Sequence, residues 1–255
     1  MKLKVFMVSL LIILGLIFIH TLQPYLTEEE NHRLQPHQII GYAYLTTEEF
    51  LRLEVHWCLE NEESVEIKFQ NIKEIAKPTD MDIKAGELEK SIIIKPTGEV
   101  QGNILAVSNA SKASTKVDIK VEFGSSYPVI FTNNVTTSIT LYVDEPYLIP
   151  YTAEIINPTN KTIKIKDVVF PIKGVKILAF GFWNESIFSV PAEPRDLPKT
   201  MPPKSKRILV IYVLIEKEVS GLVFKPKVVL EVNGKEYALS IPEMMFKRII
   251  CKKEG

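Results

Sequence analysis

The sequence predicts an all-β protein in which two tandem antiparallel β-sandwich domains follow one N-terminal transmembrane helix. Three observations support this prediction. An uncharged apolar run opens the chain. After it, short β-branched and aromatic runs alternate with turn residues in two series of about seven strands each. Beyond the opening run, no segment with a helical period is long enough to connect parallel strands, which argues against a doubly wound sheet.

The composition is that of a folded protein without a nucleic-acid partner. Its 255 residues carry 31 basic and 31 acidic side chains, so the formal net charge is +0 and a basic patch for nucleic acid is not expected. Hydrophobic residues make up 46% and charged residues 24%, which provides a core and excludes disorder by composition. Lysine far exceeds arginine and glutamate far exceeds aspartate, a bias typical of thermophiles that also suggests an archaeal source.

A retained signal anchor is expected over residues 1–23. Residues 5–22 are uncharged, and at about 1.5 Å per residue they span roughly 27 Å, enough for the hydrocarbon core of a bilayer. The residues that follow offer no small-x-small cleavage site, which favours a retained anchor over a cleaved signal peptide. Lys2 and Lys4 favour the cytoplasmic side, so residues 24–255 are expected outside the cytoplasm of a single-pass cell-membrane protein.

Acceptor sequences for N-glycosylation agree with this orientation. Each has the pattern Asn-x-Ser/Thr, and each falls at an expected turn or strand end, where a bulky sugar is tolerated. The candidate acceptors are Asn109, Asn134, Asn160 and Asn184.

The rest of the chain divides into a stalk, two domains and a tail. Residues 24–37 contain two prolines and no apolar period, so they are expected to form the stalk. The β-sandwich domains are expected over residues 38–131 and 138–246, with a basic tail over residues 247–255. Strands are expected at 38–45, 51–59, 64–70, 89–95, 101–108, 115–123 and 127–131 in the first domain. In the second, they are expected at 138–144, 149–156, 162–169, 174–182, 207–216, 222–232 and 236–241.

The first domain contains one clearly alternating strand. Over residues 51–59, apolar side chains alternate with polar ones from Arg52 to Cys58, the pattern of a half-buried strand with one wet face. The glutamate-rich segment Thr46–Glu49 is a turn or, alternatively, the cap of a helix. Residues Pro96–Gly98 predict a hairpin between the strands on either side.

The second domain carries the clearest turn signals. Asn157–Asn160 separates two apolar runs, and Asn233-Gly234 is the strongest short hairpin signal in the chain. The last segment, 244–255, mixes apolar and basic residues. It is expected to finish the last sheet, with contact to anionic lipid as the alternative.

Two of these turns carry a resemblance. The Asn157-Pro158-Thr159-Asn160 hairpin and the Pro202-Pro203-Lys204-Ser205 turn lie at places where the immunoglobulin-like sandwich modules of prokaryotic cell-surface proteins have similar sequences. The chain resembles such modules over about residues 138–242, whereas the first domain matches only in its number of strands. The resemblance implies a role in adhesion, spacing or assembly, and no catalytic residues.

The two cysteines allow two interpretations. Cys58 and Cys251 are a candidate disulfide outside the cytoplasm, which would tie the tail to the first domain, or they are two thiols that never meet. His56 and Cys58 point to the same face of a strand, a spacing that suits copper or zinc. Because further ligands do not cluster in the sequence, we expect neither a metal nor another cofactor.

Two segments are candidate surfaces for a partner. Residues 189–206 are rich in proline and lack a strand pattern, which makes Pro202 and Pro203 candidate contacts. Trp183 ends an apolar run with Phe180 and Phe182. Such a run usually packs between sheets, and an exposed aromatic patch for carbohydrate or protein is the alternative.

Sequence motifs for catalysis were not found: Gly-x-Ser-x-Gly, a phosphate-binding glycine loop and His-Glu-x-x-His are all missing from the chain. The sequence therefore predicts a non-catalytic, membrane-anchored protein that acts in surface interaction or complex assembly. One alternative is a cupredoxin-like carrier of metal or a small ligand around His56 and Cys58. Another is a glycan-binding accessory module that uses Trp183.

Overall fold

The computed structural model describes residues 38–58, 66–72, 75–84, 87–107, 112–132, 137–142 and 144–248. Over these residues the protein is all-β, as the sequence predicts, and its one helical element is the short 3-10 helix η1 (Ile187–Ser189). None of the described residues belongs to a helix that is long and apolar enough to cross a membrane. The expected anchor and stalk lie outside the described residues.

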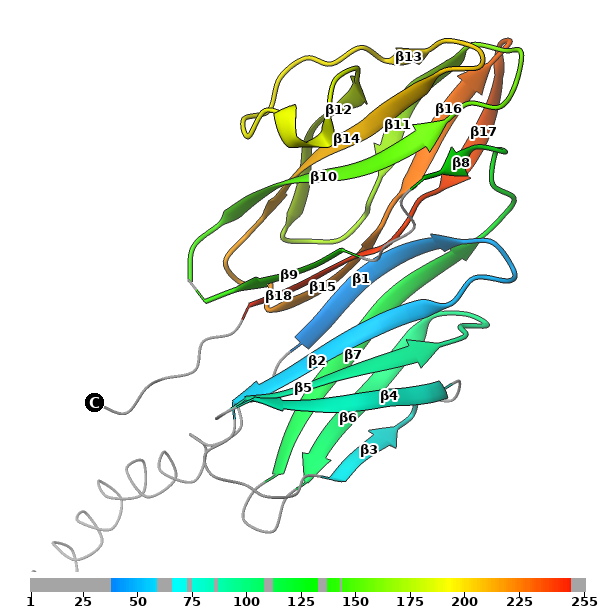
Figure 1. Ribbon diagram of the computed structural model, residues 1–255. Helices are drawn as coiled ribbons and strands as arrows, with labels where there is room; N and C mark the ends of the chain where they lie inside the picture. The colour runs from blue at the N-terminus through cyan, green and yellow to red at the C-terminus, as the bar shows by residue number, and fades with distance from the viewer. Residues whose placement is uncertain are drawn as a thin grey trace, which may run out of the picture.

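A seven-stranded sheet runs through the middle of the molecule (Figure 1). Its pairing is mixed, because β1 is parallel to both of its neighbours and β9 is parallel to β18. In order, its strands are β3 (Glu66–Gln70), β6 (Val100–Val107), β7 (Lys112–Phe123), β1 (Gln38–Leu45), β15 (Gly221–Lys225), β18 (Met244–Arg248) and β9 (Thr137–Leu141).

The other strands of the described residues form three smaller sheets. The first is β2 (Leu51–Cys58), β5 (Glu87–Ile94) and β4 (Ile75–Lys84). The second is β12 (Val175–Trp183), β14 (Lys206–Ile215), β10 (Tyr147–Ile156) and β8 (Ile130–Phe131). The third is β13 (Thr200–Met201), β11 (Ile163–Val169), β16 (Lys227–Val232) and β17 (Lys235–Ser240).

The seven-stranded sheet contributes side chains to two separate cores. Successive residues of a strand point to opposite faces. Val223 therefore packs into the core shared with β2 and β5, whereas Leu222 and Phe224 pack into the core of the two four-stranded sheets. In the same way β18 gives Met245 to the first core and Phe246 to the second.

One long hairpin joins the two halves of the molecule, each of which is built around one of these two cores. Its first arm is β15 followed by β16, and its second arm is β17 followed by β18. The two arms pair with each other in both sheets. Pro226 separates β15 from β16, because proline has no N–H for the ladder. At the tip, Asn233 and Gly234 have φ values of 53° and 74°, which confirms the predicted Asn-Gly turn.

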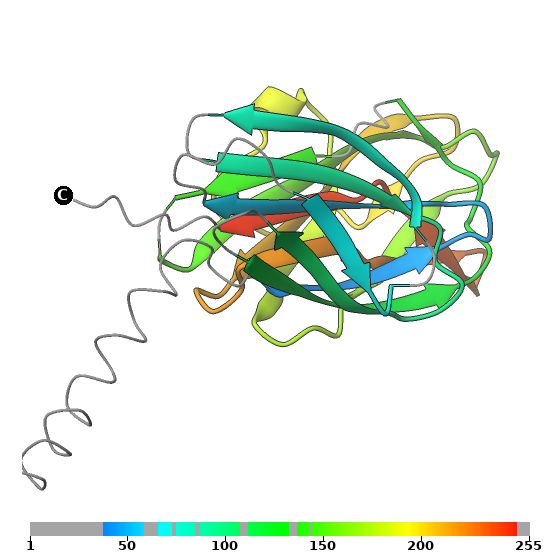
Figure 2. The ribbon, with the colours of Figure 1, turned by 90° about the horizontal axis from the view of Figure 1, so that it is seen from below.

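The strand pairing differs from two independent sandwiches in tandem. Strand β1 lies in the segment assigned to the first domain, and β15 lies in the segment assigned to the second, yet they pair in parallel from Ile39↔Gly221 to Ala43↔Lys225. Figure 2 shows the blue N-terminal strands beside the orange and red C-terminal ones. The apolar run 222–232 was expected to be one strand. It divides between two sheets because Pro226 interrupts it.

Of three local expectations, the first is decided between its two alternatives and the other two need correction. The segment Thr46–Glu49 is a turn, closed by a bond from the N–H of Glu49 to the carbonyl of Thr46 (3.2 Å). Residues Pro96–Gly98 connect β5 to β6 in a different sheet and do not form a hairpin. Strand β4 was not predicted because Pro78 and two register shifts interrupt its pattern.

The contact between β1 and β15 generates a stability prediction. A Cβ atom added at Gly41 would lie 2.7 Å from the carbonyl oxygen of Val223 and 2.8 Å from its Cβ. Gly41→Ala should therefore lower the free energy of unfolding by about 1–3 kcal/mol, because the two strands must separate. The matched control is Gly98→Ala, whose Cβ would meet nothing within 4 Å and should change stability by less than about 0.5 kcal/mol. Equal values from urea denaturation of the two variants would show that the strands are not in close contact.

Candidate functional site

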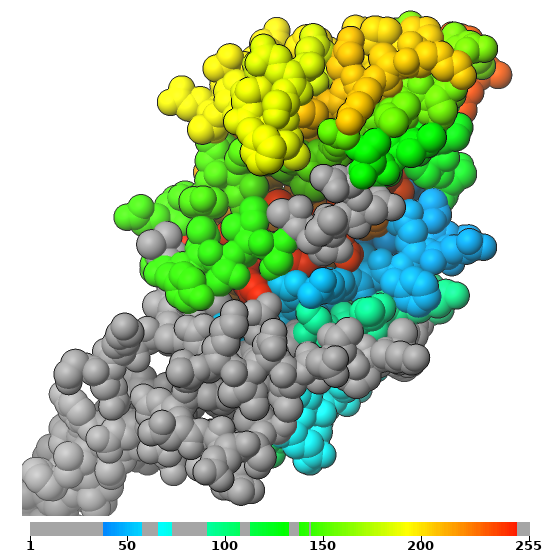
Figure 3. All heavy atoms as spheres, viewed as in Figure 1, coloured from blue at the N-terminus to red at the C-terminus, as the bar shows by residue number. Residues whose placement is uncertain are grey.

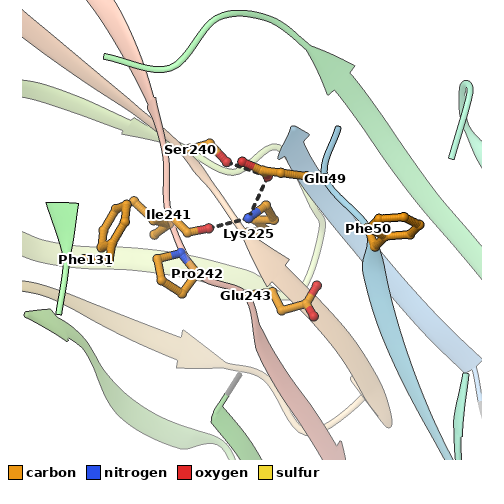
Figure 4. A pocket seen from close by; sticks show the side chains of 8 residues that line it. All are labelled: Glu49, Phe50, Phe131, Lys225, Ser240, Ile241, Pro242 and Glu243. Carbon is orange, nitrogen blue, oxygen red and sulfur yellow. Dashed lines mark hydrogen bonds and ion pairs between the residues drawn. The ribbon is translucent and has the colours of Figure 1, made fainter. Parts of the chain in front are cut away.

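A pocket lies where the loop between β1 and β2, strand β8 and the bend of the long hairpin meet (Figure 4). Its volume is about 270 Å³. Because its lining comes from both halves of the protein, its shape depends on how the halves are joined. The lining residues are Glu49, Phe50, Phe131, Lys225, Ser240, Ile241, Pro242 and Glu243.

Lys225 is the central polar group of this pocket. It is the last residue of β15 and is only 7% exposed. Its Nζ lies 3.0 Å from Glu49 Oε2 and donates a hydrogen bond of 2.5 Å to the carbonyl oxygen of Ile241. Glu49 Oε2 also accepts a hydrogen bond of 2.8 Å from the hydroxyl of Ser240. The buried ammonium is thus paired with a carboxylate, which offsets the cost of its desolvation.

Glu243 lies on the other side of Lys225 in the pocket (Figure 4). Its carboxylate oxygens accept hydrogen bonds from the backbone N–H of Arg52, at 3.1 and 3.2 Å. Next to it, the hydroxyl of Tyr151 donates to the carbonyl of Pro242 over 2.8 Å. Burial, and then the negative charge of Glu243, raise the pKa of Tyr151, so that this phenol stays protonated and remains a donor.

A second charged cluster lies between β2 and the last strands of the seven-stranded sheet. Glu54 is 5% exposed, and one of its oxygens lies 3.0 Å from Lys247 Nζ and accepts a hydrogen bond from Ser138. Its other oxygen lies 3.2 Å from Arg52. Burial acts to raise the pKa of Glu54, but the bonds from Ser138 and Lys247 and the nearby positive charges hold it below its usual value.

This cluster corrects the prediction of a wet face on β2. Glu54 and His56 are both buried, at 5% and 6% exposed. The sequence pattern showed their polarity but not the strands that cover them. Lys247 and Arg248, placed in the basic tail by the sequence, belong to β18 and are buried too. The tail therefore extends, as far as Arg248, a strand of the seven-stranded sheet that also contains β1.

The candidate metal and disulfide residues are only partly described. His56 lies on β2, whereas the side chain of Cys58 and the whole of Cys251 lie outside the described residues. Within the described part of the chain, no group of three His, Cys, Asp or Glu side chains is arranged to hold a metal ion. Both the Cys58–Cys251 bridge and the carrier alternative stay predictions.

Asn157 joins the two turns on which the resemblance rests. Its side chain is fully buried. Its Nδ2 donates to the carbonyls of Lys161 (2.8 Å) and Pro202 (3.0 Å), and its Oδ1 accepts from the backbone N–H and the hydroxyl of Thr159. The backbone N–H of Asn157 donates to Ser205. The two motifs therefore form one hydrogen-bonded unit, with Pro202 and Pro203 exposed on it.

The aromatic residues of the proposed partner surface are mostly covered. Phe182 is buried, and Trp183 is half-buried with its indole N–H donating to the hydroxyl of Ser189 over 3.1 Å. Sequence reasoning missed Phe188 in η1, which is 97% exposed. Figure 3 shows the yellow segment that contains η1 at the upper edge of this face. A role of Trp183 in carbohydrate binding remains a prediction.

Two of the candidate glycosylation sites lie in the described part of the chain. Asn160 and Asn184 are both exposed on loops, the first between β10 and β11 and the second after β12. Asn109 and Asn134 lie outside the described residues.

Comparisons with known proteins do not assign the chain to a family. Neither protein-family models nor curated proteins match it. Among solved structures, the chain is similar to titin domains I67–I69 (TM-score 0.25, 10% identity, 85% of this chain and 64% of that one). It is also similar to titin domains A164–A165 (TM-score 0.26, 8% identity, 85% and 96%). A third similar structure is a protein of unknown function from Porphyromonas gingivalis W83 (TM-score 0.27, 9% identity, 85% and 97%). Similarities this weak carry no further conclusion.

The Asn157 unit generates a second stability prediction. Asn157→Ala removes the side-chain bonds that join the two turns and leaves the carbonyls of Lys161 and Pro202 without this donor. We expect a loss of about 3 kcal/mol in the free energy of unfolding. The control is Asn160→Ala in the same turn, an exposed position where the change should stay within about 0.5 kcal/mol. Equally stable variants in chemical denaturation would contradict a structural role for Asn157.

The Glu54 cluster predicts a pH dependence. Since the folded pKa of Glu54 is below the ordinary value of 4.5, its contribution to stability is present above that pH and is lost as the pH falls through the depressed pKa. Glu54→Gln should cost about 3 kcal/mol at neutral pH, because Lys247 loses its buried partner. The difference from wild type should shrink in denaturation curves as the pH is lowered below 4.5. Glu236→Gln, which breaks an exposed pair with Lys166, should have little effect at either pH. A pH-independent difference for Glu54→Gln would rule out this linkage.

Proposed function

We propose that this protein is a non-catalytic, membrane-anchored module that displays a rigid tip outside the cytoplasm for surface interaction or complex assembly. The observation that carries the proposal is the placement of the chain ends relative to that tip. The uncharged run of residues 5–22 supports the anchor, and the acceptor asparagines support exposure outside the cytoplasm.

The two ends of the described chain lie at the same end of the seven-stranded sheet, where β1 begins and β18 stops. Ser220, just before β15, links them: its hydroxyl accepts from the N–H of Gln38 (3.1 Å), and its carbonyl accepts from the N–H of Arg248 (2.7 Å). Gln38 begins β1, which pairs with β7 from Gln38 to Leu45. An anchor in residues 5–22 would therefore attach to this end of the sheet through the stalk.

The exposed turns gather at the other end of the long hairpin. The pair Val232↔Lys235 closes its tip, and the pairs Ile163↔Met201 and Ile156↔Lys206 place the Asn157 unit nearby. Figure 1 shows the tip of β16 and β17 at the upper right, with β18 running away from it towards the lower left. From Gly221 to Val232 the arm has a maximum length of roughly 35–40 Å at about 3.3 Å per residue.

This tip suits recognition by another protein. Two of its turns, Asn157–Asn160 and Pro202–Ser205, are joined by the buried Asn157, so little of their loop entropy is lost when a partner binds. Pro202 and Pro203 are exposed there, together with Asn160. A rigid, exposed tip held away from the membrane supports a role in contact more than one in catalysis.

Site-directed photo-crosslinking in native membranes tests the proposal. A photo-reactive residue at Pro203 should give a specific adduct with a partner, whereas one at the exposed Gln101, in the other half of the molecule, should give none. Mass spectrometry of the membrane fraction should also recover peptides from residues 5–22. Recovery of the protein from the cytosol, or adducts at Gln101 alone, would overturn the proposal.

A further inference from the structure

The pocket beside Lys225 has an alternating arrangement of charge. Lys225 lies between the carboxylates of Glu49 and Glu243 (Figure 4). Lys225 and Glu243 are both at least nine-tenths buried, with exposed fractions of 7% and 9%. Each is held in place, Lys225 by Glu49 and the Ile241 carbonyl, and Glu243 by the N–H of Arg52. The polar groups are thus fixed before any ligand arrives, which reduces the entropic cost of binding.

Two aromatic rings complete the lining. Phe50 follows Glu49 in the loop before β2 and is 50% exposed, and Phe131 comes from β8 on the opposite side (Figure 4). The half-exposed ring of Phe50, with Lys95 Nζ 5.7 Å from its centroid, gives an apolar surface for the carbon skeleton of a ligand. The lining therefore combines hydrogen-bonding groups in its middle with apolar walls at its sides.

The charge pattern selects against charged ligands. An anion in this pocket would lie beside two carboxylates, and like charges placed together are strongly unfavourable. A cation attracted by Glu243 would lie beside the Lys225 ammonium, and the repulsion between the two positive charges offsets that attraction. Neutral hydroxyl groups avoid both costs, since each both donates and accepts: they can donate to the carboxylates and accept from the ammonium, which has three N–H groups.

We propose that this pocket binds one neutral sugar ring. A ring of that kind has hydroxyls around its edge and a C–H surface on its faces, which matches polar groups flanked by Phe50 and Phe131. The volume of about 270 Å³ lies just below the range of about 300–1,000 Å³ for sites of drug-sized ligands, and it suits a single ring. The site is separate from Trp183, and the inference does not depend on whether the chain is anchored in a membrane.

Saturation-transfer NMR and calorimetry on the full-length chain in lipid nanodiscs test the inference. The probes are glucose, galactose and mannose, with glucosamine and glucuronate as a cationic and an anionic form of nearly the same ring. At least one neutral hexose should bind saturably with a Kd on the order of 1 mM, as expected for so small a ligand. Glucosamine and glucuronate should bind at least about fivefold more weakly than that hexose. The same measurement with the methyl glycoside of that hexose distinguishes two sources of the ligand. Binding of the glycoside indicates a terminal residue of a glycan, which it mimics, and binding of the hexose alone indicates a free sugar.

Two phenylalanine variants provide the matched control. Phe50→Ala should weaken binding of that hexose about tenfold, because it removes one apolar wall at a half-exposed position where folding is little affected. Phe188→Ala removes an even more exposed ring that is not part of the pocket lining and should leave the Kd unchanged. Absence of saturable binding by all three hexoses, tighter binding of a charged form, or equal Kd values for the two variants would overturn the inference.

Discussion

The structure depends on the strict alternation of side chains in the central sheet, because both faces of β1, β15 and β18 are covered. Val223 and Met245 fill one core, and their neighbours Phe224 and Phe246 fill the other. A shift of one residue in the register would exchange these sets and would place each side chain in a core of the wrong shape. The register of the long hairpin is therefore fixed in both of its sheets. The hairpin in turn fixes the two halves of the protein relative to each other.

Charged residues lie at this junction as well as apolar ones. Lys225 with Glu49, and Lys247 with Glu54, are ion pairs that connect the β15–β18 segment to the β1–β2 loop and to β2. Buried pairs of this kind add little net stability, since desolvation offsets their attraction. A mispacked junction, however, would leave each buried charge without its partner, which is costly. We interpret the pairs as determinants of a single docking geometry between the halves.

Local features of the fold could be predicted from the sequence, and long-range ones could not. The Asn233-Gly234 turn and most strand positions follow from residue type and from alternation over a few residues. The pairing of β1 with β15 joins residues about 180 positions apart, and no local pattern encodes it. The pocket was missed for the same reason, although one signal was present: Lys225 interrupts an apolar run directly before Pro226. The wet face assigned to β2 was wrong because Glu54 looks like a surface residue until β18 is placed against it.

The direction of β1 has a mechanical consequence. In the proposed arrangement, with an anchor before Gln38 and a partner at the tip, a pull would act along the axis of β1. On both sides, this strand is bonded in parallel to β7 and β15. Such a load is shared by many backbone hydrogen bonds at once, in shear, and does not open them one after another as peeling a hairpin from its end would. In the arrangement that we propose, the fold is thus suited to bear tension between the anchor and a partner bound at the tip.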